Sequence, residues 1–257
     1  MLLLKILVSV AAVVLLSVVA ERVSTRAAGV LSGFPLGTGI TLFFIGLEQG
    51  TEFVAQGAFH TSIGFAATLM LAWSWYQMTI RFEKMQVLLA VLVSIGMFFL
   101  TAAVLRQIPA NAVTALLVPV CAIFLAIRKM GAIENAVVEG SVKAGWPVLL
   151  IRAFLAAMVV VTITGLANLV GPEWSGLLSA FPVTVFPLLL IIHITYGPRQ
   201  LNTIIKNYPY GLGSLVLYAC SVHWTYPLLG VYLGTVVSLS LAVIYILIYY
   251  QLSYRCQ

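Results

Sequence analysis

Nine apolar runs follow one another along this sequence, each close to the length that an α-helix needs to cross a bilayer. A spanning helix takes about 20 apolar residues. With 62% hydrophobic and 8% charged residues, the chain carries more apolar surface than a soluble fold of 257 residues can bury. We therefore expect an all-α, polytopic membrane protein that is embedded in the lipid bilayer. The predicted spans are residues 2–20, 28–48, 58–80, 86–104, 109–127, 148–170, 174–197, 207–225 and 227–250.

Basic residues predict how these spans are oriented. They lie singly between apolar runs, a distribution typical of membrane-protein loops and not of a nucleic-acid-binding surface. Because basic loop residues stay in the cytoplasm during insertion, we expect the N-terminus outside and the C-terminus inside. The residues on the predicted inner side are Arg22, Arg26, Arg81, Lys84, Arg128, Lys129, Lys143, Arg199, Lys206 and Arg255.

One stretch of the sequence occurs twice. Residues 28–35 return as residues 175–182, so that Phe34-Pro35 pairs with Phe181-Pro182 at an offset of 147 positions. The same ungapped register pairs Gly50 with Gly197 and Gly64 with Gly211. A fixed offset of this kind indicates a duplicated unit. We expect a first transmembrane repeat over residues 1–104, a linker helix and cytoplasmic loop over 105–147, and a second repeat over 148–257.

The number of spans predicts how the two copies are related. Each copy has four spans and a fifth lies between them, so equivalent spans run through the membrane in opposite directions. The expected fold is therefore two inverted four-helix repeats joined by one extra helix. Inverted repeats are the architecture of many secondary transporters, whose substrate sites lie near the membrane centre at broken helices.

Each copy places a proline inside an apolar span, and we expect the helix to break there. Pro35 and Pro182 lack an amide hydrogen, which frees the carbonyl groups of Leu31 and Leu178. Such breaks persist in a membrane only against protein or water, although kinked helices that merely pack together are an alternative explanation. The residues predicted to bind substrate at the two breaks are Ser32, Pro35, Thr38, Ser179, Pro182 and Thr184.

Two ionisable residues are candidates for proton or cation coupling. Glu48 closes the second span, where a buried carboxylate would be functional, but water at the outer interface would also explain it. His193 lies one turn inside the seventh span, where it either relays protons or hydrogen-bonds a neighbouring helix. The sequence carries no P-loop, zinc-protease or serine-hydrolase motif. We expect no enzyme activity, catalytic residue, cofactor or metal site.

The second copy, from Trp174 to about Gln251, resembles the GlpM-type bacterial inner-membrane proteins. The residues that carry the resemblance are Gly176-Leu177, Phe181-Pro182, His193, Tyr196-Gly197, Gly211-Leu212 and Tyr218. The first copy keeps Gly29, Phe34-Pro35, Gly50 and Gly64 but has Gly46 in place of the histidine. The resemblance implies a bacterial inner membrane, with a periplasmic N-terminus, and relatives that function near glycerol metabolism and exopolysaccharide production. It implies no established substrate.

Two functions of different classes remain open from the sequence. The first is a secondary transporter that works by alternating access on a small anion or an envelope or lipid-linked precursor, with proton coupling as one option. The second is a membrane scaffold or accessory subunit in envelope polysaccharide or lipid biosynthesis. A polar cavity beside Pro35 and Pro182 would favour the transporter, and tight packing there the scaffold. A homodimer is compatible with either, and nucleic acid is not an expected partner.

Overall fold

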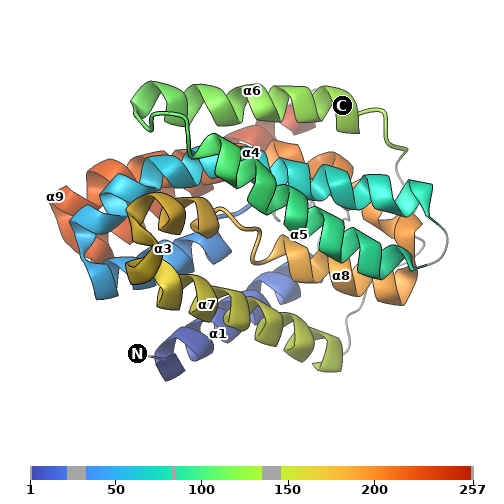
Figure 1. Ribbon diagram of the computed structural model, residues 1–257, viewed down its shortest axis with the longest axis horizontal. Helices are drawn as coiled ribbons and strands as arrows, with labels where there is room; N and C mark the ends of the chain where they lie inside the picture. Colours follow the sequence, from blue (N-terminus) through green and yellow to red (C-terminus); the bar gives the residue numbers. More distant parts are fainter. Residues whose placement is uncertain (1, 22–32, 83–84, 135–145, 256–257) are drawn as a thin grey trace.

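The computed structural model is a bundle of helices in which residues 2–21, 33–82, 85–134 and 146–255 are described (Figure 1). Every regular element in these ranges is helical, which confirms the all-α prediction. The elements are α1 (Leu2–Glu21), α3 (Leu36–Gln49), α4 (Thr51–Arg81), α5 (Gln86–Leu105), α6 (Ala112–Met130), α7 (Trp146–Ser179), α8 (Val185–Tyr196), the 3₁₀ turn Pro198–Gln200 and α9 (Leu201–Arg255).

Four of the described helices are long and apolar enough to cross a membrane, where the sequence predicts nine spans. They cover Gln86–Leu105, Ala112–Met130, Leu149–Ser179 and Pro198–Gln251. Large apolar side chains such as Leu92, Leu117 and Leu233 are at least half exposed on their outer faces. Exposed apolar surface over whole helices is expected of a protein whose surroundings are lipid. The helices therefore indicate a membrane protein, with span boundaries that differ from those predicted.

Two of the long apolar helices each consist of two arms that meet at a single glycine. α7 bends at Gly171 (φ 77°, ψ 173°) and α9 bends at Gly230 (φ 74°, ψ 174°), positions close to predicted gaps between spans. A positive φ of this size is accessible to glycine and costly for other residues. Across the first kink, the Ser175 hydroxyl donates to the Ala167 carbonyl at 3.0 Å. Each of these long helices is therefore two helical arms, and the turn between them lies at or near a predicted gap between spans.

Equivalent glycines end α3 and α8 with nearly the same backbone geometry. Gly50 has φ 92° and ψ 164°, and Gly197 has φ 84° and ψ 174°. Each donates its amide hydrogen to the carbonyl four residues earlier, at Gly46 and at His193. These positions lie 147 residues apart, the offset of the sequence repeat. The repeat therefore specifies the same turn twice.

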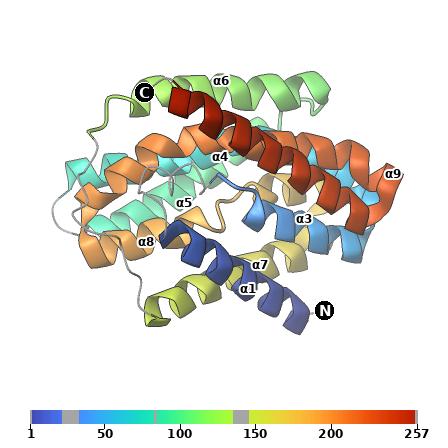
Figure 2. The same cartoon turned by 180° about the vertical axis from the view of Figure 1, so that it is seen from behind.

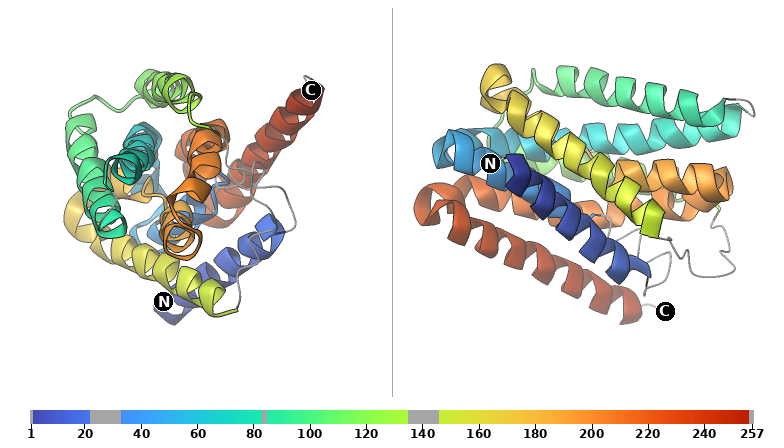
Figure 3. Two further views of the ribbon diagram at one scale, coloured as in Figure 1. Left: turned by 90° about the vertical axis from the view of Figure 1, so that its right-hand side faces the viewer. Right: turned by 90° about the horizontal axis from the view of Figure 1, so that it is seen from below.

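Equivalent helices of the two halves pack side by side and run in opposite directions. α1 lies along α7, and the two run antiparallel in the right-hand view of Figure 3. α4 lies against the first arm of α9, which runs the opposite way before α9 turns back at Gly230 (Figure 2). Matching elements thus make two of the three most extensive contacts between the halves, and the third joins α4 to α7.

The linker helix α6 lies across the outside of α4 and α9 (Figure 1). Its first turn is held by a capping box, in which the Asn111 side chain accepts from the amides of Val113 and Thr114 at 3.0 Å. The Ser62 hydroxyl of α4 donates to the Ala115 carbonyl at 2.6 Å and fixes α6 on the bundle. Most of the predicted cytoplasmic loop, residues 135–145, lies outside the described residues.

Candidate functional site

The chain departs from helical conformation around Pro182, as predicted, and a helix begins after Pro35, while residues 22–32 before it lie outside the described residues. α3 begins at Leu36, directly after Pro35, and residues 180–184 separate the end of α7 from the start of α8 around Pro182. The Leu178 carbonyl, which Pro182 leaves without its helical partner, accepts from the Phe181 amide at 2.9 Å. Leu31 and Ser32 lie outside the described residues.

The two breaks lie against each other. A Cβ atom placed on Gly37, in the first turn of α3, would lie 2.8 Å from the Cβ of Val183 in the second break. The same position is 3.5 Å from the methyl group of Thr184. Glycine at position 37 therefore lets the first turn of α3 contact the segment that leads into α8.

Each break is held by a hydroxyl group from the other half of the chain. The Ser214 hydroxyl of α9 donates to the Gly33 carbonyl at 2.7 Å. The Thr68 hydroxyl of α4 donates to the Ala180 carbonyl at 2.5 Å. Gly33 and Ala180 are equivalent in the repeat, and their hydroxyl donors are equivalent to within one residue. Such bonds supply the partners that carbonyl groups at a helix break require in lipid.

Two backbone contacts beside these bonds are also reciprocal. Gly33 lies directly on the backbone of Gly211, with no room for a Cβ atom between them. In the matching contact, a Cβ atom on Gly64 would lie 2.8 Å from the Cβ of Ala180. At the 147-residue offset, Gly33 is equivalent to Ala180 and Gly64 is equivalent to Gly211, so the two contacts are the same contact made once by each half. The sequence pairs Gly64 with Gly211 but gives no sign that each contacts the opposite break.

A small cavity lies where the breaks cross. The space that the centre of a water molecule can occupy in this cavity is about 10 Å³, which is room for about one water. Three predicted substrate-binding residues, Thr38, Pro182 and Thr184, line it together. The other lining residues are Phe34, Gly37, Phe65, Ala180, Phe181, Val183, Tyr208 and Leu215. A cavity therefore lies beside the predicted substrate-binding residues, but it has room for only about one water molecule.

Pro35 and Ser179 are not among the residues that line this cavity. Pro35 precedes the first turn of α3, and the Ser179 hydroxyl donates at 2.7 Å to the Ser175 carbonyl of its own helix. Ser179 therefore stabilises the last turn of α7 and leaves no hydroxyl free for a ligand. Tyr208, which the sequence analysis missed, brings a hydroxyl-bearing side chain from the first arm of α9 to the cavity.

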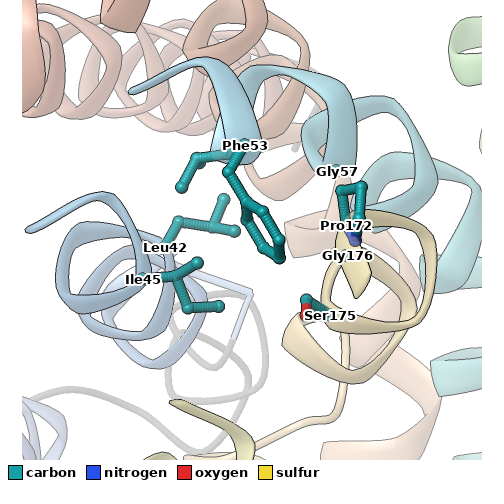
Figure 4. A pocket seen from close by; sticks show the side chains of 8 residues that line it. Leu42, Ile45, Phe53, Gly57, Pro172, Ser175 and Gly176 are labelled. Carbon is teal, nitrogen blue, oxygen red and sulfur yellow. The ribbon is translucent and has the colours of Figure 1, made fainter. Parts of the chain in front are cut away.

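A second space between the two halves is dry. It lies between α3, α4 and α7 and has no room for the centre of a water molecule (Figure 4). The side chains of Leu42, Ile45 and Phe53 face the helix that begins again at Pro172. Beside it, the backbone of Gly57 touches that of Gly176. Apolar packing thus closes the bundle at this end.

Glu48, one predicted coupling residue, forms an ion pair. Its carboxylate accepts from the Lys5 ammonium at 2.6 Å, and Lys5 also donates to the Thr164 hydroxyl at 2.8 Å. The Lys5 side chain is 7% exposed and that of Glu48 is 24% exposed. The cluster joins α1, α3 and α7. Its neighbour Glu52 is exposed, so only Glu48 of these two carboxylates is drawn into the protein.

His193, the other predicted coupling residue, is 4% exposed and hydrogen-bonded to a neighbouring helix. The indole nitrogen of Trp75 donates to its Nδ1 at 3.3 Å. Because Nδ1 accepts, the neutral ring carries its hydrogen on Nε2, and Nε2 is buried without a partner among the described residues. The contact matches the helix-packing alternative, and a role in proton transfer stays a prediction.

Comparison with family models, with curated proteins and with solved structures finds no match for this chain. The resemblance to GlpM-type proteins therefore stays a prediction. Within the described residues, no group of three or more histidine, cysteine or acidic side chains is placed to hold a metal ion.

Proposed function

We propose that this chain is a secondary transporter that works by alternating access, with its solute site at the crossing of the two helix breaks. The observation that carries the proposal is the reciprocal contact between halves, in which Gly33 rests on Gly211 and Ala180 on Gly64. Two matching halves that hold each other's breaks can exchange their conformations. Such an exchange gives outward-open and inward-open states of similar energy, as in other inverted-repeat transporters.

The proposed membrane arrangement has nine crossings with the N-terminus outside. Each arm of the helices kinked at Gly171 and Gly230 counts as one crossing, and so does each segment broken at Pro35 and Pro182. The opposite directions of α1 and α7, and of α4 and the first arm of α9, support this arrangement (Figure 3). The side on which basic loop residues gather supports the orientation.

In this proposal the structure represents a closed state. The crossing has room for about one water, and the apolar contact around Phe53 and Pro172 has none. The same tight packing favours the second candidate, a membrane scaffold in envelope polysaccharide or lipid biosynthesis. The two functions differ in one physical property, since only a transporter exposes the crossing to water on each side in turn.

Thiol labelling from the two sides of the membrane separates these functions. In a variant without Cys121, Cys220 and Cys256, a single cysteine is introduced as Thr38→Cys or, in a second protein, Thr184→Cys. A membrane-impermeant maleimide is then added outside or inside proteoliposomes. Alternating access predicts labelling from both sides, because the crossing opens to each in turn. Labelling from neither side, in folded protein, would refute the transporter and leave the scaffold.

The matched control is Thr41→Cys. Thr41 lies one turn further along α3, is fully buried, and donates at 2.9 Å to the Gly37 carbonyl. It should stay unlabelled from either side, which shows that labelling at position 38 reports the crossing and not general loosening of α3. Uptake of a panel of small radiolabelled solutes into the same vesicles then tests transport itself.

A further inference from the structure

We infer that the crossing cavity binds a single small monovalent anion, such as a halide. The inference rests on the proposed function, because it names the class of solute that the transporter carries. Its basis is the chemistry that converges on the cavity from the described part of the chain: two helix N-termini, three hydroxyl-bearing side chains and, among these residues, no charged side chain.

The first observation is that both broken helices begin at the cavity. α3, of 14 residues, starts at Leu36, and α8, of 12 residues, starts at Val185. Neither N-terminus has a side-chain cap. The first amide groups of a helix lack partners within it, and each N-terminus carries about half a positive charge. The Leu36 and Phe186 amides already donate to the Phe34 and Pro182 carbonyls, and Pro187 has no amide hydrogen, so the two ends together supply less than about one positive charge, which suits a monovalent and not a divalent anion.

The second observation is independent of the helix ends. Thr38, Thr184 and Tyr208 line the cavity and are 4%, 5% and 1% exposed. Among the described residues, none hydrogen-bonds any of their three hydroxyl groups. Buried hydroxyl groups ordinarily have partners, because an unpaired one costs free energy. An anion accepts hydrogen bonds and gives all three hydroxyls something to donate to.

The carbonyl groups at the breaks argue against a cation. A cation would need free oxygen acceptors, yet most carbonyls here already accept a hydrogen bond. Val183 is an exception, because Pro187, four residues on, has no amide hydrogen to offer it. The carbonyl groups that accept a hydrogen bond from a backbone amide or a hydroxyl group are those of Gly33, Phe34, Pro35, Leu177, Leu178, Ala180, Phe181 and Pro182. The three hydroxyl groups can accept as well as donate, so the preference for an anion comes from the positive ends of α3 and α8.

The lining also limits the charge and size of the ligand. Among the described residues, no lysine or arginine lines the cavity to balance a second negative charge, and Phe34, Phe65 and Phe181 narrow it. An unbalanced charge is costly in such a low-dielectric site. With room for about one water, the cavity fits an ion of one atom. Sulfate and divalent phosphate are disfavoured on both grounds.

The test is anion-dependent thermal unfolding of the purified protein in detergent. Chloride and bromide are titrated at constant ionic strength against sulfate, and sodium is replaced by potassium and choline at fixed chloride. A ligand that binds the folded state raises the unfolding temperature along a saturable curve. We expect saturable stabilisation by one or more monovalent anions, none by sulfate, and no dependence on the cation. A cation requirement, equal stabilisation by sulfate, or no saturable effect would overturn the inference.

Variants then locate the binding. Thr38→Val and Thr184→Val each remove a hydroxyl donor and should weaken the apparent affinity about tenfold, since a hydrogen bond to a charged group is worth about that factor. Thr41→Val is the matched control, because that hydroxyl is already paired within its helix, and it should bind as the parent does. Equal affinity in all three variants would place the anion elsewhere. If the valine variants do not fold, the anion selectivity of the parent protein in the unfolding assay tests the inference.

Binding and transport can fail separately. Saturable monovalent-anion binding without labelling of position 38 from both sides would support this inference and refute the transporter. Labelling from both sides without such binding would support the transporter and refute the anion.

Discussion

The buried Lys5–Glu48 ion pair makes the most direct prediction about stability. Lys5→Met keeps the length of the side chain but removes the ammonium group that contacts the Glu48 carboxylate at 2.6 Å. Glu48 is then left in a largely buried position with no cation opposite it. Removing one partner of a buried pair typically costs 3–5 kcal/mol, because the other charge stays buried and uncompensated.

The exposure of the pair sets the expected magnitude. Lys5 is 7% exposed, but Glu48 is 24% exposed and keeps some contact with solvent. We therefore expect a loss near the lower limit, about 3 kcal/mol. For a chain of this size about 1 kcal/mol corresponds to 2–4 °C, so the unfolding temperature should fall by roughly 6–12 °C. The double variant Lys5→Met/Glu48→Leu removes both charges and should recover to within about 1 kcal/mol of the parent.

The assay is thermal unfolding in detergent, followed by the fluorescence of the five tryptophans. Glu173→Gln is the matched control, since the Arg106–Glu173 pair has a similar distance of 2.9 Å but side chains that are 48% and 50% exposed. It should cost less than about 1 kcal/mol. A Lys5→Met loss as small as that of the control, or a double variant less stable than either single variant, would refute the reasoning.

Three further predictions follow from the packing of α4, α5 and the second break. Gly64→Ala should lower the free energy of unfolding by about 1–3 kcal/mol, because the added methyl group overpacks the crossing. Gly96→Ala, where the added Cβ meets open space, should raise the free energy of unfolding by about 0.5–1 kcal/mol, and thermal unfolding of the two variants checks that the signs are opposite. Trp75→Phe should cost about 1–3 kcal/mol in the same assay, since His193 Nδ1 loses its donor while buried. Pro182→Ala should fold at least as well as the parent but lose solute uptake in proteoliposomes, because the break is no longer enforced; full uptake would contradict the role given to the break.

The sequence predicted the class of the fold and the places where its helices are interrupted. Long apolar runs can satisfy their backbone in lipid only as helices, and a proline removes the hydrogen bond of a specific carbonyl. These effects act within a few residues, so Pro182, Gly50 and Gly197 mark interruptions that the structure contains, and a helix begins directly after Pro35. The sequence also predicted gaps between spans near Gly171 and Gly230, but not that one glycine makes each turn, because a loop and a tight turn have similar composition over so few residues.

Only the tertiary structure decided which polar groups are paired and which stay free. Thr38 and Ser179 look alike in the sequence, yet one lines the crossing cavity and the other is paired within α7. Ser214 reaches the Gly33 carbonyl across 181 residues of chain, and Lys5 reaches Glu48 across 43. Local chemistry creates the unpaired donors and acceptors, but their partners come from helices that meet only after the chain has folded. The sequence therefore located the breaks, and packing between the two halves determined which hydroxyl groups remain available at the crossing.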